Sequence, residues 1–318
     1  FETFMGPEHH GLPADNFQEF PGPRVAPRTS PTNIGMGLLS TLAAHDLGFI
    51  RTAELLERID ATLTTLAGLE RHEGHFFNWY DTHDLAPLLP RYVSTVDSGN
   101  LAGALITLGE GLRGLARAEG GALPADVVAR LLELATRAGA FAEQMSFRFL
   151  YDARRELLSI GYRAADSEAP GRLDPTQYDL LASEARLASF IAIAKGDLPE
   201  LHWFRLGRAV TGVHGVPTLL SWSGSMFEYL MPLLVMRSYP GTLLERSCRM
   251  AVRRQRDYAA ARRVPWGISE AGYDLVDRHE NHQYKAFGVP GLGFKRGLAH
   301  ELVVAPYASA LAVRLEPA

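Results

Sequence analysis

Two glutamates stand among apolar residues, where a charged side chain needs a partner, a proton or a chemical role. Glu228 lies in "LSWSGSMFEYLMP" (residues 220–232), a stretch rich in Trp, Met, Phe and Leu. Glu184, in "YDLLASEARLASF", follows Leu180 by four residues and precedes Leu187 by three, which places it on the apolar face of an expected helix. Moving a charge out of water costs several kcal/mol unless it is paired or used. Both positions are therefore candidates for a functional site.

Glu270 and Asp97 are two further acids in segments rich in small and aromatic residues. Glu270, in "WGISEAGYD", lies in a glycine-flanked loop beside Trp266 and Tyr273, and Asp97, in "STVDSGN", stands where a helix is expected to begin. Glycoside chemistry needs two carboxyl groups across the scissile bond, one protonated to help the leaving oxygen depart and one ionised to attack or to activate water. Apolar surroundings raise the pKa of one group and so separate these roles.

Each acid also has a purely structural explanation, and the residue pattern leaves these alternatives open. Glu184 can pair with Arg186 or another arginine, Glu270 can cap a turn, and Asp97 can be a helix N-cap. Glu228 can form a buried ion pair with an arginine. If the acids are functional, we expect all four to converge on one face of the fold.

The composition describes an ordinary globular chain with a neutral or weakly charged partner. Its 318 residues are 47% hydrophobic and 21% charged, which is enough to bury a substantial core. The formal net charge is -4 and the basic residues are scattered among acids, which argues against nucleic acid as a partner. The longest apolar stretches run to about a dozen residues, too short to span a bilayer.

The chain holds a single cysteine, Cys248, which excludes an internal disulfide framework and favours a reducing compartment. We expect Cys248 to be a small buried side chain. The N-terminus has no basic-then-apolar secretory signal. These features predict a cytoplasmic location.

Helical periodicity dominates the sequence, and alternating strand patterns are scarce. Leu101, Leu105, Leu108 and Leu112 repeat at spacings of three and four. Since no strict repeat of fixed length appears, this pattern favours an all-α closed toroid over a solenoid. We predict short extended pieces near 147–151 and 157–163 and helices near 33–46, 52–69, 98–118, 125–145, 177–195, 200–211, 224–238, 241–263 and 299–313.

Loops rich in aromatic and small polar residues recur wherever an inner helix would begin. A toroid would bring them to one rim, where flat aromatic faces suit the C–H faces of sugar rings. The alternative is that these aromatics only seal the ends of the barrel. The residues expected to line a carbohydrate groove are Trp79, Tyr80, Trp222, Trp266 and Tyr273.

Other chemistries have weaker support. "HEGH" at 72–75 and "HENH" at 279–282 place histidines three apart, but neither is the His-Glu-x-x-His arrangement that presents two metal ligands on one helical face. No phosphate-binding glycine loop or nucleophile elbow is present in the sequence. We therefore expect neither a metal nor a cofactor.

Six long blocks, in order along residues 1–318, carry a specific resemblance to a known family: "RTSPTNIGMGLLSTLAAHDLGFI", "GHFFNWYDT", "RYVSTVDSGNLAG", "YDLLASEARLASFIAIAKGDLP", "LSWSGSMFEYLMPLLVM" and "WGISEAGYD". The chain resembles the glycoamylase-like cyclization domain of bacterial cyclic β-1,2-glucan synthases, assigned to glycoside hydrolase family 189. The resemblance implies an (α/α)6 barrel formed by one domain over 1–318. It also implies retaining transglycosylation, in which a linear β-1,2-glucan is cut and its ends are joined into a ring.

The resemblance also assigns roles to the acids. Glu184 is expected to be the general acid/base and Glu270 the nucleophile. Glu228 is then expected to be a groove acid that hydrogen-bonds glucose hydroxyls or tunes the pKa of Glu270. Asp97 is expected to contact the substrate.

The parent proteins of this family are larger than the present chain. They carry a membrane-embedded glycosyltransferase before this domain and a phosphorylase-like domain after it, which would place the domain at the inner face of the bacterial inner membrane. The chain stops soon after "VVAPYASALA", so we expect an incomplete toroid. Two alternatives to cyclization remain: an endo-β-1,2-glucanase, and an inactive glucan-binding or structural fragment of a synthase.

Overall fold

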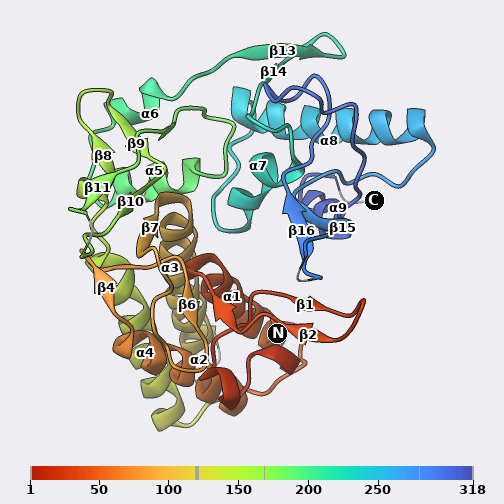
Figure 1. Ribbon diagram of the computed structural model, residues 1–318. Coiled ribbons are helices and arrows are strands. Elements are labelled where there is room, and N and C mark those ends of the chain that lie inside the picture. Colours follow the sequence, from red (N-terminus) through yellow and green to blue (C-terminus); the bar gives the residue numbers. More distant parts are fainter. Residues whose placement is uncertain (1, 119–121, 168, 279, 317–318) are drawn as a thin grey trace. The chain divides into compact units, whose positions relative to one another are not determined.

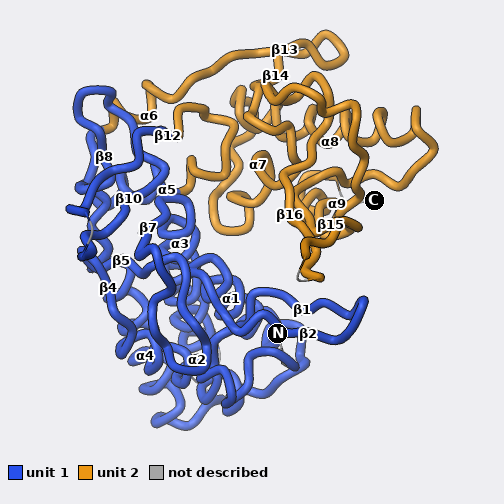
Figure 2. The backbone as a smooth tube through the Cα atoms, viewed as in Figure 1, with its two compact units in different colours: residues 1–177, 188–199 blue, residues 178–187, 200–318 orange. Residues whose placement is uncertain are grey.

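The chain divides into two units whose segments alternate along the sequence (Figure 2). Unit 1 comprises Phe1–Gln177 and Ala188–Pro199, and unit 2 comprises Tyr178–Leu187 and Glu200–Ala318. The computed structural model describes residues 2–118, 122–167, 169–278 and 280–316. The single domain expected over 1–318 stays a prediction.

Four long helices form the core of unit 1 (Figure 1). They are α1 (Pro31–Asp46), α2 (Thr52–Gly68), α3 (Thr95–Ala118) and α4 (Ala125–Gln144). The α3 helix packs against both α1 and α4, and α2 contacts the same two helices. The leucines that repeat along α3 are fully buried between these neighbours, as their spacing predicts: Leu101, Leu105, Leu108 and Leu112.

A close approach joins α3 to α5 (Arg186–Ala194), a helix that begins in unit 2 and continues in unit 1. A Cβ atom at Gly99 would lie 2.5 Å from the Cβ of Ala188, far inside van der Waals contact. Only glycine at position 99 allows the two backbones to come this near. The end of α5 is held as well, because the ammonium group of Lys195 donates to the carbonyls of Ala142 and Glu143 at the end of α4.

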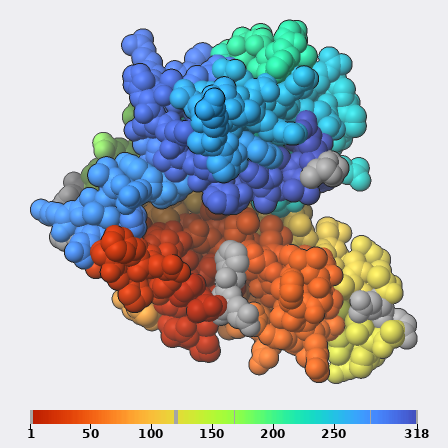
Figure 3. Space-filling view, turned by 90° about the vertical axis from the view of Figure 1, so that its right-hand side faces the viewer, coloured from red at the N-terminus to blue at the C-terminus, as the bar shows by residue number. Residues whose placement is uncertain are grey.

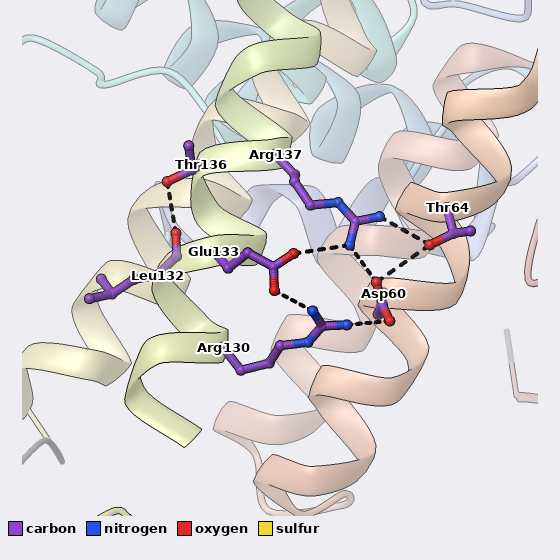
Figure 4. A network of polar contacts seen from close by, with 7 residues as sticks. All are labelled: Asp60, Thr64, Arg130, Leu132, Glu133, Thr136 and Arg137. Carbon is purple, nitrogen blue, oxygen red and sulfur yellow. Dashed lines mark hydrogen bonds and ion pairs between the residues drawn. The ribbon is translucent and has the colours of Figure 1, made fainter. Parts of the chain in front are cut away.

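A network of charged side chains joins α2 to α4 (Figure 4). The Asp60 carboxylate accepts from Arg130 and Arg137, and Glu133 pairs with the same two arginines. Thr64 accepts a further bond from Arg137 at 3.0 Å. Although burial alone would raise it, the two guanidinium groups hold the pKa of Asp60 below its usual range. The network is about one-third exposed, so we assign it a modest share of the stability.

The N-terminal segment covers the outer side of the first helices. The Thr62 hydroxyl on α2 donates to the carbonyl of Gly11, and the Thr65 hydroxyl donates to that of His10. In the space-filling view these N-terminal residues, in red, lie beside the orange helices (Figure 3). The segment contains two short 3-10 turns, Glu2–Phe4 and Pro7–His9.

Short strands connect the helices of unit 1. Three antiparallel pairs are β1 (Phe17–Gln18) with β2 (Arg24–Val25), β3 (Arg28–Thr29) with β6 (Tyr80–Asp81), and β4 (Arg71–His72) with β5 (His75–Phe76). One three-stranded sheet has β10 (Gly161–Arg163) between β7 (Tyr92–Ser94) and β11 (Arg172–Leu173). Another has β9 (Leu157–Ser159) between β8 (Tyr151–Asp152) and β12 (Gln177–Tyr178), the last of which lies at the unit boundary.

Unit 2 is built around one long helix, α8 (Leu243–Arg262), which packs against the hairpin of β13 (Val210–Val213) and β14 (Val216–Leu219). The short helix α7 (Met226–Leu230) contacts both α8 and α9 (Pro306–Ala312). Cys248 on α8 is fully buried, as predicted. The remaining elements are α6 (Leu201–Arg205), a 3-10 turn at Met231–Leu234, and the hairpin of β15 (Ala271–Val276) with β16 (His282–Lys285).

The expectation of an all-α chain is corrected by these strands. Helices α1, α2, α3, α4 and α8 lie where they are predicted, but sixteen short strands occur in the described residues. Most have two to four residues, too short for an alternating pattern to emerge in the sequence. The predicted helices at 177–195 and 299–313 shrink to their C-terminal halves, and the one at 200–211 shrinks to its beginning. The helix predicted at 224–238 becomes the short α7 and the 3-10 turn that follows it. Across the described segments, no helix combines the length and the apolar character that a membrane crossing requires.

Candidate active site

The loop that precedes α7 wraps around the carboxylate of Glu228. Ser225 caps the helix by accepting from the amide of Glu228, while Glu228 accepts from the amide of Ser225 at 3.0 Å, a reciprocal capping box. The same carboxylate accepts from the amide of Trp222 at 3.0 Å and from the hydroxyl of Ser221 at 2.9 Å. The amide and hydroxyl of Ser223 and the hydroxyl of Ser225 also donate to it.

These contacts correct the groove role expected for Glu228. The side chain is 4% exposed, and its acceptor positions are occupied by the "SWSGS" loop, so it is a structural acid that organises this loop. The ion pair with an arginine is also absent from the described contacts, because Arg186 donates to the carbonyl oxygen of Glu228 instead. The charge of Glu228 contributes to the raised pKa of Glu270, and a role in tuning that pKa stays a prediction.

Glu184 lies in a turn just before α5 and not on a helix face, which corrects the position inferred from periodicity. Ser183 starts this turn: its hydroxyl accepts from the amide of Ala185 at 3.2 Å and contacts the Glu184 carboxyl group at 3.3 Å. Burial raises the pKa of Glu184 to about 8, and the negative charges of Glu228 and Glu270 push it in the same direction. Glu184 is therefore mostly protonated at neutral pH.

Glu270 lies in the loop that enters β15 and is half-buried. Burial raises its pKa, and so does the charge of Glu228. Two groups act the other way: the Tyr284 hydroxyl, which donates to the carboxylate at 2.8 Å, and the positive charge of Lys295. These two groups favour the ionised form of Glu270, although burial keeps its pKa above the usual value.

Sequence reasoning missed Tyr284 and Tyr307. Tyr284 lies on β16 opposite Gly272, and its pKa is raised by burial and by the Glu270 charge. The Tyr307 hydroxyl, on α9, lies 2.9 Å from both the Ser269 hydroxyl and the Glu270 carbonyl. Tyr284 sits inside "HENHQYKAFGVPGLGF", a loop whose aromatic content was a usable signal. No signal in the sequence indicated Tyr307, because this residue comes 37 residues after Glu270.

Three of the aromatic residues predicted to line a carbohydrate groove lie in unit 2, and all three are partly accessible. Trp222 is 49% exposed, and its indole N–H donates to Asp179 at 3.1 Å, which fixes the orientation of the ring. Trp266 and Tyr273 are half-buried on the two sides of Glu270 in the sequence. Their role in binding sugar stays a prediction.

The predicted residues of unit 1 differ from one another in exposure. Tyr80 is fully buried and its hydroxyl donates to the carbonyl of Glu70 at 2.6 Å, so its expected substrate contact is replaced by a structural role. Trp79 is half-buried, and the guanidinium of Arg28 lies 4.7 Å from its ring centroid. Neither side chain belongs to the unit that holds the glutamates.

Asp97 lies in the first turn of α3, where the hydroxyl of Ser94 accepts from its amide at 3.3 Å. Its carboxylate accepts from the hydroxyl of Thr32 and from the amide nitrogen of Asn78. Burial raises the pKa of Asp97. Glu184, Glu228 and Glu270 all belong to unit 2, and the charges of the last two act on Glu184. The convergence of all four acids on one face stays a prediction.

Within the described part of the chain, no three His, Cys, Asp or Glu side chains gather in a way that could hold a metal ion. His279 of the "HENH" block lies outside the described residues. In the "HEGH" block, the His75 ring is fully buried and hydrogen-bonds to the Ser146 carbonyl at 2.9 Å. Burial lowers the pKa of His75 to about 3, so it is a neutral core residue.

Comparison with known proteins identifies the kind of domain. Residues 177–318 match the family model called Glycoamylase. The whole chain is 37% identical to the cyclic β-(1,2)-glucan synthase NdvB of Rhizobium meliloti (strain 1021), and it spans 15% of that protein's length.

Two solved structures share the fold. Endo-β-1,2-glucanase from Talaromyces funiculosus has a TM-score of 0.76 and 14% identity, over 97% of this chain and 69% of that chain. Endo-β-1,2-glucanase from Chitinophaga pinensis has a TM-score of 0.69 and 13% identity, over 98% of this chain and 75% of that chain.

The fold is therefore that of the glucanase and glucoamylase-like proteins, largely helical with short sheets. Within that class, the chain is similar over its whole length to a segment of a cyclic β-1,2-glucan synthase. The resemblance drawn from the six sequence blocks is confirmed.

Proposed function

We propose that this chain acts on β-1,2-glucan as a retaining transglycosylase that closes a linear chain into a ring. The observation that carries the proposal is the pair of carboxyl groups in unit 2. Burial and like charge hold Glu184 protonated near neutral pH. Burial also raises the pKa of Glu270, and the Tyr284 hydroxyl and the Lys295 charge oppose that rise. An acid and a nucleophile of this kind are what a retaining glycosidase requires.

In the proposed reaction, Glu184 gives its proton to the glycosidic oxygen as the bond to the anomeric carbon breaks. The Glu270 carboxylate attacks that carbon and forms a glycosyl ester. The 2-hydroxyl at the non-reducing end of the same chain then attacks the anomeric carbon, and the bond from this carbon to the Glu270 oxygen breaks. Glu184 takes the hydroxyl proton, Glu270 leaves as a carboxylate, and the ring is closed.

Similarity to a cyclic β-1,2-glucan synthase and to endo-β-1,2-glucanases supports β-1,2-glucan as the substrate. We extend the proposal to the (α/α)6 toroid, because folds of this class are helical barrels. We also propose a parent protein in which a membrane glycosyltransferase supplies the linear glucan and a phosphorylase-like domain is present. The chain's 15% share of the matched synthase is compatible with such a parent.

The decisive experiment is incubation of the protein with linear β-1,2-glucan, followed by mass spectrometry. A ring is lighter than the linear chain of the same length by one water and has no reducing end. Products of this kind that disappear in Glu270→Gln support cyclization. Products that all carry reducing ends support instead the endo-β-1,2-glucanase alternative, which the two solved structures favour.

Stereochemistry gives a second test. Retention passes through a covalent intermediate, so the first product released by water keeps the β-configuration. Proton NMR during the first minutes of reaction distinguishes the two outcomes. An initial α-anomer would exclude Glu270 as a nucleophile and would assign it to water activation.

A further inference from the structure

Arg186, the first residue of α5, is a buried cation in a unit that gathers three acids, yet its hydrogen bonds go to main-chain carbonyls. The side chain is 1% exposed. Its guanidinium donates to the carbonyls of Ser183 at 2.8 Å, Glu228 at 2.7 Å and Tyr229 at 2.5 Å. A buried charge usually pairs with an opposite charge or costs several kcal/mol. Placement against carbonyls alone therefore calls for an explanation.

The bonds of Arg186 join the turn that carries Glu184 to α7. Ser183 directly precedes Glu184, so the hydrogen bond from Arg186 to the Ser183 carbonyl holds the turn next to Glu184. The other two bonds, to the carbonyls of Glu228 and Tyr229, hold the middle of α7. The start of this helix is fixed by the Glu228 capping box. Arg186 is thus a rigid bridge between two pieces of backbone.

The same helix also holds the loop that carries Glu270. The amide of Met226 donates to the carbonyl of Ile268 at 3.2 Å, and the amide of Phe227 donates to the hydroxyl of Ser269 at 3.0 Å. Ser269 directly precedes Glu270. Both carboxyl groups are therefore fastened to α7 through the residue before them, one by Arg186 and the other by Ser269.

We propose that Arg186 is a positioning residue that sets Glu184 against Glu270 by bridging the Ser183 turn to α7. This inference rests on the proposed function for its effect on turnover. It goes beyond that function because Arg186 touches neither the substrate nor the reacting atoms. Its proposed role is to fix the position of one carboxyl group relative to the other. Arg186 also places a positive charge near Glu184, which favours the carboxylate form.

The electrostatic surroundings of Glu184 come from several elements. Glu228 on α7 and Glu270 before β15 raise its pKa. Arg186 on α5 acts in the opposite sense, since the charges of the two groups interact favourably. Tyr284 on β16 also faces Glu184. Removing the guanidinium therefore raises the pKa of Glu184, whereas a lysine in its place keeps the charge and loses the bridge.

The first test needs no substrate. The protein is labelled with ¹³C at glutamate side-chain carboxyl carbons, the Glu184 signal is assigned with Glu184→Gln, and its titration midpoint is measured by NMR. We expect Arg186→Met to raise the midpoint and Arg186→Lys to leave it unchanged. An unchanged midpoint in folded Arg186→Met would overturn the electrostatic half of the proposal, whatever the activity of the protein.

The second test is kinetic, with linear β-1,2-glucan. We expect both Arg186 variants to lose about 100-fold in kcat with little change in KM, because a displacement of about 1 Å can cost this much. Arg208→Met is the matched control, since Arg208 also donates to main-chain carbonyls, those of Trp203, Phe204 and Leu206. It should keep the wild-type kcat.

The outcomes of the two tests separate this inference from the proposed function. Wild-type turnover in folded Arg186→Lys would overturn the positioning role. Failure of both Arg186 variants to fold, judged by circular dichroism, would also overturn it in favour of a role in stability alone. If the wild-type protein forms no product from β-1,2-glucan, the proposed function fails, while the NMR midpoint still tests Arg186.

Discussion

At the scale of single residues, the pKa of Glu184 controls the predicted pH dependence of activity. Burial and like charge raise it to about 8, and the acid is useful only while protonated. We expect kcat to fall as pH rises through about 8. In Glu184→Gln this basic limb should be absent, and kcat should be about 10²–10⁴-fold lower. A pH profile of kcat for both proteins checks this, and a basic limb that survives in the variant would contradict it.

The same pKa makes stability depend on pH. Between the ordinary value of 4.5 and the folded value of about 8, the folded protein holds a proton on Glu184 that the unfolded chain releases. The free energy of unfolding therefore falls as pH rises through this window, by at most about 1.4 kcal/mol per pH unit. Since Gln cannot lose a proton, the difference between the Tm of Glu184→Gln and that of the wild type should increase from pH 5 to pH 8. Thermal melts at several pH values measure this, with Glu200→Gln as an exposed control.

Tyr284 supplies the hydroxyl that favours an ionised Glu270. Tyr284 is 68% exposed, so solvent weakens its bond to Glu270, and we expect Tyr284→Phe to lose up to about tenfold in kcat. The pKa of Glu270 should rise, and the acidic limb of the pH profile should move to higher pH. Tyr239→Phe, which alters another exposed tyrosine, is the matched control. Equal profiles for the two variants would remove Tyr284 from the site.

At the scale of elements, the capping loop of α7 sets the geometry of the site. Glu228→Gln replaces an acceptor by an amide that faces hydrogen-bond donors, so we expect a loss of roughly 1.5–3 kcal/mol in the free energy of unfolding. Ser225→Ala should cost less, about 0.5–2 kcal/mol, because it removes only the cap. Urea unfolding monitored by circular dichroism gives both values. A Glu228→Gln protein as stable as wild type would refute the structural role of this acid.

The elements also explain how far sequence reasoning reached. The leucine spacing of α3 predicts a long amphipathic helix correctly, because helix packing depends on the local 3.6-residue period. Periodicity failed around Glu184, because the helix begins only at Arg186 and the apolar residues before it lie in a buried turn. A turn and a helix can bury the same residues, and the difference lies in hydrogen bonds such as that of Ser183, which no local pattern reveals.

Candidate site residues were found where an acid stood out against its neighbours, as Glu184, Glu228 and Glu270 do. The role of Glu228 was misjudged, because a capping box that also collects donors from Ser221 and Trp222 depends on the path of the whole loop. Tyr307 was missed because only the tertiary fold brings it to Glu270.

At the scale of the whole molecule, the balance between transfer and hydrolysis depends on how the acceptor is held. Water at roughly 55 M competes for the glycosyl ester, but a well-held intramolecular hydroxyl can reach effective molarities of about 10⁵–10⁸ M. We expect Trp222→Ala or Trp266→Ala to raise the ratio of linear to cyclic products, because these accessible rings can hold the acceptor end. Chromatography of the products measures the ratio. Unchanged ratios in both variants would place the acceptor elsewhere.

The helix α5 belongs to both units, and this has a thermodynamic consequence. Its first turn carries Arg186, while the residues that follow pack against α3 at Gly99 and end at the lysine that binds the α4 carbonyls. When unit 1 melts, α5 loses the surroundings that keep it helical, and the Ser183 turn loses its continuation. We therefore expect melting of α5 to disturb the turn that carries Glu184. A destabilising substitution far from the carboxyl groups, in the α3 or α4 helix, reduces the population of molecules in which Glu184 is correctly held.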